Sequence, residues 1–172
     1  PCLPKSPYAW SKYLFDRIVT SADVSEFGCR VQGFRYFNVF GEYEDHKGPQ
    51  ASIFHQFRKQ AFNGSIQPFQ NSDNYYRDFI YVGDICKITE KFLDIDESGI
   101  WNIGSGHAES IGAVAKFMSE HMGVPIKEVE MPASLHGQYQ EYTCSDNTKL
   151  LNTIGDFKFT TPYEWMKNGN KT

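Results

Sequence analysis

A tyrosine and a lysine lie four positions apart near the start of the chain, in the stretch S-P-Y-A-W-S-K. Ser6 suits the N-cap of a helix and Pro7 its first position, so Tyr8 and Lys12 are predicted to leave the same helical face. A free tyrosine accepts protons poorly at neutral pH, whereas an adjacent ammonium stabilises the phenolate and makes the ring a usable general acid or base. The spacing therefore fits a proton-transfer pair. It also fits two ordinary residues of a helix, because Y-x-x-x-K is common by chance.

A second group of candidates follows a predicted strand. In R-Y-F-N-V-F-G, Asn38 and Val39 are expected just past the carboxyl end of that strand, where ligands bind in open α/β sheets. In the next loop, D-H-K-G displays Lys47 beside a glycine, where a lysine could bind phosphate or transfer protons. A capped strand end and a solvated surface lysine are the ordinary alternatives, and His46 has no neighbours at metal-ligand spacing.

Arg77 lies in a further segment that suits phosphate, before an apolar strand. A guanidinium binds phosphate through two parallel hydrogen bonds. Asp84 is predicted to cap the helix that follows this strand. Gly104-Ser105-Gly106 lacks the third glycine of a phosphate-binding loop, and we interpret it as a turn between a strand and a helix.

Helices and strands alternate along the chain, with glycine-rich turns after several strands. This order predicts an α/β domain with part of its sheet parallel, and the shorter elements after about residue 66 indicate a smaller lobe. Helical periodicity covers residues 8–27, 51–62, 84–95 and 110–122, and strand patterns cover 29–37, 67–70, 78–82, 99–103 and 126–130.

The net charge of the 172 residues is −4, which gives no electrostatic reason to expect a nucleic-acid partner. No apolar run approaches the ~20 residues of a membrane span, so no membrane association is expected. The four cysteines are scattered without a C-x-x-C pair, which fits reduced thiols in a cytoplasmic protein better than disulfides or a zinc site. The first residue is not Met, and we expect the chain to be a piece of a longer polypeptide.

Three motifs occur in order along the chain: Y-x-x-x-K, then R-Y-F-N-V-x-G, then R-D-F-I-Y-V-x-D. Together they resemble the C-terminal half of extended short-chain dehydrogenases/reductases that act on nucleotide sugars. Within that superfamily the chain is similar to the ADP-L-glycero-D-manno-heptose 6-epimerases, through H-K-G-x-x-A-S at 46–52, F-Q-N-S at 69–72 and G-Q-Y-Q at 137–140. The implied fold is the last part of a Rossmann-type NADP-binding sheet over residues 1–65. Residues 66–172 would form mainly a nucleotide-sugar-binding lobe, with some segments returning to the sheet.

The resemblance also implies roles for individual residues. Tyr8 and Lys47 would be the two catalytic acid/bases, and Lys12 would bind the nicotinamide ribose and activate the tyrosine. NADP is the implied cofactor, with NAD possible, and Tyr8, Lys12, Val39 and Lys47 would contact it. The implied contacts with the ADP-sugar substrate are Asn38, His55, Phe69, Gln70, Asn71, Ser72, Arg77 and Tyr139.

The implied reaction is epimerisation at C6 of the heptose of ADP-glycero-manno-heptose, a step toward lipopolysaccharide heptose precursors. Hydride removal gives a transient 6-keto sugar, which presents its opposite face before the hydride returns. One residue cannot easily serve both faces, so two bases are expected.

The family's G-x-x-G-x-x-G turn, which receives the cofactor pyrophosphate, does not occur in these residues. We therefore expect the missing N-terminal half of the same polypeptide to supply it. On its own, the chain is expected neither to bind NADP tightly nor to turn over substrate. The resemblance also implies a homo-oligomer.

Three positions depart from the heptose-epimerase pattern. Pro49 follows H-K-G where the family has a small polar residue, one residue is missing before His55, and Gln138 stands in place of an arginine. Two alternatives stay open. One is another nucleotide-sugar epimerase or dehydratase, acting on UDP-hexoses, which does not need the H-K-G lysine; the other is a non-catalytic module that binds a sugar nucleotide.

Overall fold

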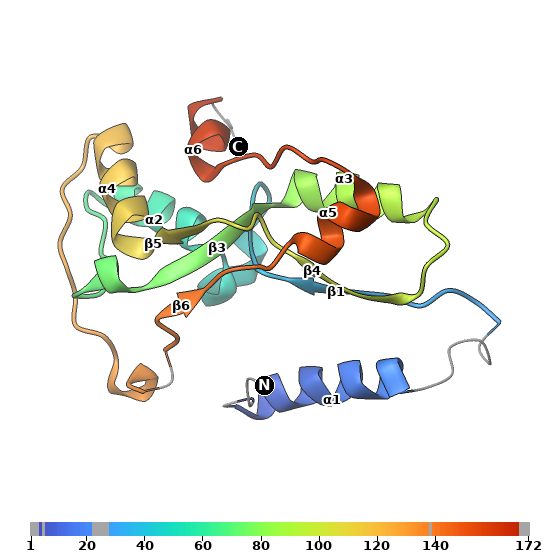
Figure 1. The fold of residues 1–172 in the computed structure, drawn as a ribbon. Coiled ribbons are helices and arrows are strands. Elements are labelled where there is room, and N and C mark those ends of the chain that lie inside the picture. The colour runs from blue at the N-terminus through green and yellow to red at the C-terminus, as the bar shows by residue number, and fades with distance from the viewer. Residues whose placement is uncertain (1–3, 5, 22–27, 138, 169–172) are drawn as a thin grey trace.

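The computed structural model describes residues 4, 6–21, 28–137 and 139–168, and Figure 1 shows the arrangement of its elements. The first helix, α1 (Pro7–Ser21), begins as predicted, because the Ser6 hydroxyl accepts a hydrogen bond from the backbone N–H of Ala9. None of its residues is buried, and its ribbon runs beside the strands rather than between them (Figure 1). The predicted end of this helix near residue 27 lies outside the described residues, as does Gln138.

The strand predicted over 29–37 is in fact followed by a second strand with a different partner. β1 (Gln32–Tyr36) pairs in parallel with β4 (Gly99–Ile103), and the Phe37 N–H still bonds the carbonyl of Ile103. From Asn38 the chain changes partner, and β2 (Asn38–Phe40) pairs in parallel with β3 (Tyr76–Tyr81). Asn38 and Val39 therefore lie just past the end of β1, as predicted, but they also form a second strand that the sequence did not reveal.

β3 is the central strand of the second sheet. Besides β2 it pairs antiparallel with β5 (Ala108–Ser110) and in parallel with the two-residue β6 (Tyr142–Thr143). The strands predicted over 67–70 and 126–130 do not form, and only isolated bridges join Ile66 to Ile126 and Phe69 to Val129. Pro68 has no N–H to donate, so it interrupts the ladder between these bridges.

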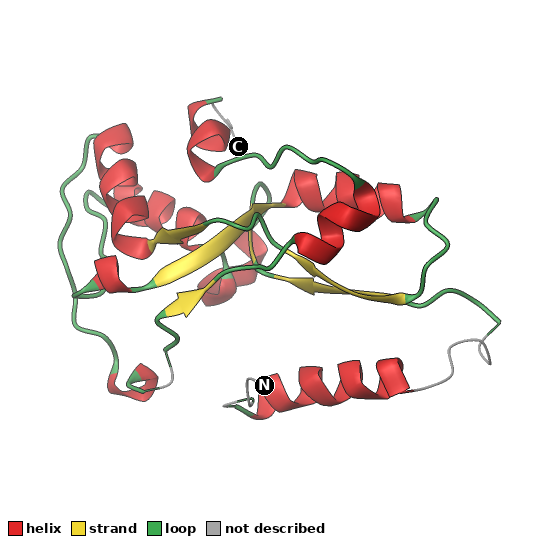
Figure 2. Cartoon of the chain, viewed as in Figure 1, coloured by secondary structure: helices red, strands yellow, loops and turns green. Residues whose placement is uncertain are grey.

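Helices cover both faces of β3 (Figure 2). Phe79 packs with α2 (Ile53–Phe62) and α4 (Ile111–Met122), whereas Ile80, pointing to the other face, packs with α3 (Val82–Phe92) and α5 (Thr148–Ile154). The first cluster buries Phe40, Phe54, Phe57, Ala61, Ile66, Phe79, Ile111, Val114, Ala115 and Met118. The second buries Ile80, Ile88, Phe92, Trp101, Ile103 and Leu150. The predicted α/β architecture with parallel strand pairing is confirmed.

Helix boundaries follow the local sequence at α2 and α4, where Ser52 and Ser110 are N-caps whose hydroxyls accept backbone N–H bonds. The prediction that Asp84 caps α3 was wrong. The helix begins at Val82, and Asp84 lies buried in its first turn. Its carboxylate accepts a bond from the Thr160 N–H at 2.5 Å, so it anchors the segment before the last helix, α6 (Pro162–Lys167), rather than capping α3.

The turn Gly104-Ser105-Gly106 folds around the buried carboxylate of Asp78, which lies on β3. This carboxylate accepts bonds from the Ser105 N–H at 2.7 Å, the Ser105 hydroxyl at 2.6 Å and the Gly106 N–H at 3.0 Å. The Ser145 N–H, from the segment after β6, adds a fourth at 2.9 Å. A β-carbon on Gly104 would lie 2.7 Å from Asp78 Oδ2, which explains the glycine. The turn is therefore structural, but it joins β4 to the short strand β5 and not directly to a helix as predicted.

Candidate functional site

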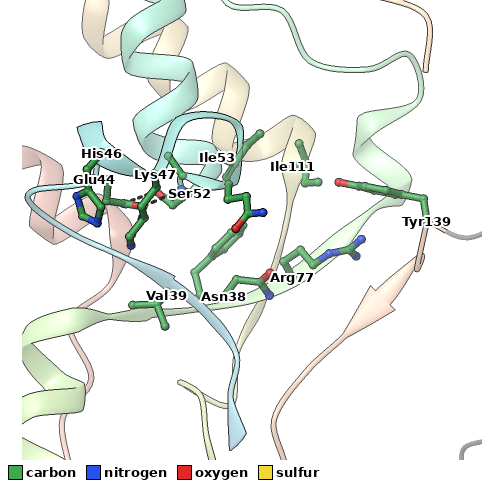
Figure 3. A pocket seen from close by; sticks show the side chains of 13 residues that line it. Asn38, Val39, Glu44, His46, Lys47, Ser52, Ile53, Arg77, Ile111 and Tyr139 are labelled. Atoms are coloured by element: carbon green, nitrogen blue, oxygen red, sulfur yellow. Dashed lines mark hydrogen bonds and ion pairs between the residues drawn. The ribbon is translucent and has the colours of Figure 1, made fainter. Parts of the chain in front are cut away.

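A pocket of about 720 Å³ opens where β2 and β3 meet the loop before α2 (Figure 3). Several elements contribute to its wall: β2, the short 3-10 helix η2 (Asp45–Gln50), the start of α2, β3 and the start of α4. The lining residues are Asn38, Val39, Glu44, His46, Lys47, Gln50, Ala51, Ser52, Ile53, Arg77, Phe79, Ile111 and Tyr139.

This pocket collects five of the residues singled out from the sequence, namely Asn38, Val39, Lys47, Arg77 and Tyr139. They come from four separate stretches of the chain, and the fold alone brings them to one cavity. Asn38 is held in place because its side-chain amide donates to the backbone carbonyl of Asp78 at 3.1 Å. The five residues provide an amide, an ammonium, a guanidinium and a phenol around one space.

The other predicted contacts lie elsewhere. His55 is buried on α2 and faces a separate cavity of about 40 Å³, where its Nε2 is 3.3 Å from Asp45 Oδ1. Phe69 and Tyr139 make a T-shaped ring contact, with 6.2 Å between centroids, so Phe69 supports a lining residue. Gln70, Asn71 and Ser72 follow Phe69 and are not among the residues that line the pocket.

Tyr8 and Lys12 share one face of α1, as the spacing predicts, with the Lys12 Nζ 5.3 Å from the centre of the tyrosine ring. Tyr8 is 72% exposed, and neither residue is among those that line the pocket. An ion pair of 2.6 Å between Asp16 and Arg35 fastens α1 to β1, the strand that leads into Asn38. The predicted catalytic roles of Tyr8 and Lys12 stay predictions.

Arg77 and Tyr139 form the end of the pocket away from Lys47 (Figure 3). The guanidinium carbon lies 4.7 Å from the centre of the tyrosine ring, which is a cation–π contact. Tyr75 and Phe69 each make a T-shaped contact with the same ring, so Tyr139 is held by aromatic neighbours. Burial raises the pKa of Tyr139, and the nearby Arg77 opposes this shift only in part. At neutral pH Tyr139 is therefore a neutral phenol beside a cation. This end of the pocket can bind an anionic group together with a flat one.

Glu44 also lines the pocket, and the sequence did not single it out. It is 3% exposed, and its carboxylate accepts bonds from Gly41, Lys47 and Ser52. Burial by itself would raise the pKa of Glu44, but the bonds from the Ser52 hydroxyl and N–H, the Lys47 ammonium and the Gly41 N–H outweigh it and lower that pKa. The nearby letters G-E-Y-E-D show three acidic side chains and do not indicate which one turns inward.

The lowered pKa of Glu44 predicts a pH dependence of stability. A carboxyl group whose pKa is lower in the folded protein stabilises the fold above its ordinary pKa of 4.5, and this contribution is lost as the pH falls through the lowered value. Glu44→Gln should therefore be less stable than the wild type at about pH 7, and the gap should narrow toward about pH 3. Urea unfolding of both proteins across this range measures the gap. A gap that stays constant with pH would contradict the assignment.

No group of three or more His, Cys, Asp or Glu side chains that could hold a metal ion occurs among residues 4, 6–21, 28–137 and 139–168. Within the same residues, no helix is long and apolar enough to cross a membrane.

The description "NAD dependent epimerase/dehydratase family" belongs to the family model that matches residues 1–104. Among solved structures, the ADP-L-glycero-D-manno-heptose-6-epimerase of Helicobacter pylori superposes with a TM-score of 0.81 at 24% identity, over 96% of this chain and 50% of that one. The UDP-glucose 4-epimerase of Thermotoga maritima, solved with UDP-glucose, gives 0.82 at 24% identity, over 96% and 52%. RMD of Pseudomonas aeruginosa, complexed with NADPH, gives 0.73 at 20% identity, over 95% and 53%.

These likenesses show the fold. The chain spans about half the length of each of these solved structures. Its α/β arrangement matches the C-terminal portion of extended epimerases of the short-chain dehydrogenase/reductase type, as the sequence motifs predict.

Proposed function

The chain belongs to the NAD dependent epimerase/dehydratase family, and we propose that it is the substrate-binding and proton-transferring part of a nucleotide-sugar epimerase. The observation that supports this most is that one pocket is lined by Asn38, Lys47, Arg77 and Tyr139 together. The Lys47 ammonium lies at one end of that pocket, and the Arg77 guanidinium with the Tyr139 ring lies at the other. A nucleotide sugar has the same order of parts: a reacting hydroxyl, a diphosphate and a flat base.

The substrate we propose is an ADP-glycero-manno-heptose, epimerised at C6 of the heptose. Two observations support this choice. Lys47 of the H-K-G motif lines the same pocket as Asn38, and a heptose 6-epimerase is among the solved structures of the same fold. Arg77 would bind the diphosphate, because a guanidinium matches two phosphate oxygens, and Tyr139 would contact the nucleoside beside it. We also propose that Phe69, Gln70, Asn71, Ser72 and His55 support these contacts from outside the pocket lining.

We propose that residues of α1 and β2 form part of a nicotinamide site. Lys12 lies over the ring of Tyr8 on an exposed helical face, and Val39 lines the pocket from β2. We propose that Tyr8, Lys12, Val39 and Lys47 would touch NADP, with NAD as the alternative. When bound, a nicotinamide cofactor supplies hydride transfer, while the protein supplies orientation and protons.

The protons would be handled by two side chains. We propose that Tyr8 removes or returns the proton of the C6 hydroxyl on one face of the sugar, and that Lys47 does so on the other. Asn38 would orient the sugar, since its amide is already fixed by the bond to the Asp78 carbonyl. Two bases are needed because the hydroxyl points to opposite sides of C6 before and after the inversion.

The remaining parts of the proposal concern the whole protein. We propose that residues 1–65 complete a cofactor-binding domain and that residues 66–172 form mainly the substrate lobe. The N-terminal half of the same polypeptide and a second copy of the protein are the proposed partners, and a cytoplasmic location is proposed. The pairing of β4 with β1 agrees with segments of the lobe returning to the first domain.

A substrate panel tests the proposal in the whole enzyme. We expect turnover of ADP-glycero-manno-heptose, with kcat/KM at least about a hundredfold above that of UDP-glucose, because polar pockets reject ligands that leave their groups unpaired. NMR of the sugar protons follows the inversion at C6. Preference for UDP-glucose would instead support a UDP-hexose epimerase, a reading that the similarity to the Thermotoga maritima fold keeps open. If both nucleotide sugars bind but neither is turned over, the proposal that the protein is an enzyme is contradicted.

A further inference from the structure

Glu44 is a buried carboxylate at the wall of the pocket, placed in the loop between β2 and α2. Burying a carboxylate costs free energy unless charged or polar partners surround it. Glu44 has four bonds to three residues. Three of them come from neutral donors, and the fourth comes from the ammonium of Lys47.

The neutral donors fix the position of the carboxylate. Oε1 accepts from the Gly41 N–H at 3.2 Å and from the Ser52 hydroxyl at 2.6 Å, and Oε2 accepts from the Ser52 N–H at 2.8 Å. Gly41 and Ser52 lie at the two ends of the loop that carries Lys47, so one carboxylate closes that loop. Ser52 is also the N-cap of α2, which connects the carboxylate to a helix of the core.

The bond to Lys47 is the longest of the four and differs in kind. Lys47 Nζ lies 3.4 Å from Oε2, and the lysine side chain remains 39% exposed while that of Glu44 is 2% exposed. A rigid anion therefore holds one side of an ammonium whose other side faces the pocket (Figure 3). An exposed lysine without such an anchor would sample many rotamers of its flexible stem.

We propose that Glu44 is the positioning residue of Lys47, holding its ammonium at the pocket wall beside Asn38 and Val39 in the orientation needed for proton transfer. This role rests on the proposed function of Lys47. It explains why an anion is buried in a loop that would otherwise need only neutral contacts. In this proposal Glu44 acts through the lysine and not on the substrate itself.

A purely structural clamp is the competing explanation, because Glu44 also closes the loop. The two explanations differ in what happens at the Lys47 amine. If Glu44 only closes the loop, its replacement changes stability and leaves the amine of Lys47 as reactive as before in the folded protein. If Glu44 positions the ammonium, its replacement releases the amine selectively.

Competitive acetylation of lysines in the whole, folded protein distinguishes the two explanations and does not require enzyme activity. In Glu44→Gln, we expect acetic anhydride to label Lys47 about threefold faster than in the wild type, the modest size that suits a partly exposed pair. Lys59 and Lys116, which do not contact Glu44, serve as internal references by mass spectrometry. Glu42→Gln is the matched control, since Glu42 lies in the same loop but bonds Tyr81 and Trp165.

Glu44→Asp covers the case in which the Gln variant does not fold. It keeps the charge but is one methylene shorter, so Lys47 should still be labelled faster than in the wild type. Unchanged labelling of Lys47 in the folded Glu44 variants, or an equal increase in Glu42→Gln, would overturn the proposal.

Activity gives a second readout. With substrate, Glu44→Gln should lower kcat about tenfold and leave KM within about twofold, because Lys47 would act in the transition state. If no variant or wild type shows epimerase activity, the proposed function fails, whereas the labelling result still decides the role of Glu44.

Discussion

Replacing Lys47 by methionine in the whole enzyme should lower kcat for C6 epimerisation by about 10²–10⁴-fold, the usual contribution of a positioned acid or base. Methionine keeps an unbranched apolar stem and removes the ammonium, so the change tests proton transfer rather than packing. Tyr8→Phe, which removes one hydroxyl from an exposed ring, should cause a loss of the same order. NMR of the heptose protons measures the inversion directly.

Matched controls come from the same elements. Lys59→Met removes a lysine of α2 that is 60% exposed and pairs only loosely with Asp45, so turnover should stay within about twofold of the wild type. Tyr13→Phe is the corresponding change on α1, at a residue whose ring packs against Trp10. Normal turnover in both Lys47→Met and Tyr8→Phe would refute the two-base assignment. If turnover is lost in only one of the two variants, a single base must serve both faces of the sugar carbon.

The sequence predicts the fold well where local signals agree with tertiary contacts. The serine caps fix the starts of α1, α2 and α4, and the apolar run at 99–103 forms β4. The strand predictions fail where a strand depends on its partner. The pattern over 29–37 does not reveal that the chain leaves β4 and joins β3 at Asn38, since both strands have the same apolar character.

The candidate site likewise contains residues that the sequence singles out and one that it does not. Lys47, Asn38, Arg77 and Tyr139 stand out because their residue types or motifs point to chemistry, and the pocket unites them. Glu44 could not be found, because only the folded loop distinguishes it from the neighbouring Glu42 and Asp45. The role of a carboxylate is decided by its partners, and Gly41 and Ser52 lie three and eight residues away from Glu44.

Asp78 presents the same problem with a larger energetic consequence. It lies one position after Arg77 in the R-D-F motif, where the sequence suggests ligand contacts. Its carboxylate is nevertheless fully buried and accepts hydrogen bonds from backbone N–H groups. Asp78→Ala should lower the free energy of unfolding by about 4 kcal/mol, because Ser105, Gly106 and Ser145 would each lose a charged acceptor in the protein interior. Urea unfolding followed by tryptophan fluorescence measures the loss.

A loss of this size corresponds to a fall in Tm of about 10 °C for a chain of this length. Asp73→Ala is the control, because Asp73 is 61% exposed and its pair with Lys116 should contribute less than about 1 kcal/mol. The effect should also reach the pocket, since Arg77 and Phe79 line it on either side of Asp78 and Asn38 bonds the Asp78 carbonyl. If Asp78→Ala costs no more than the Asp73 variant, the turn at 104–106 must be held by other contacts, and β3 does not depend on this carboxylate.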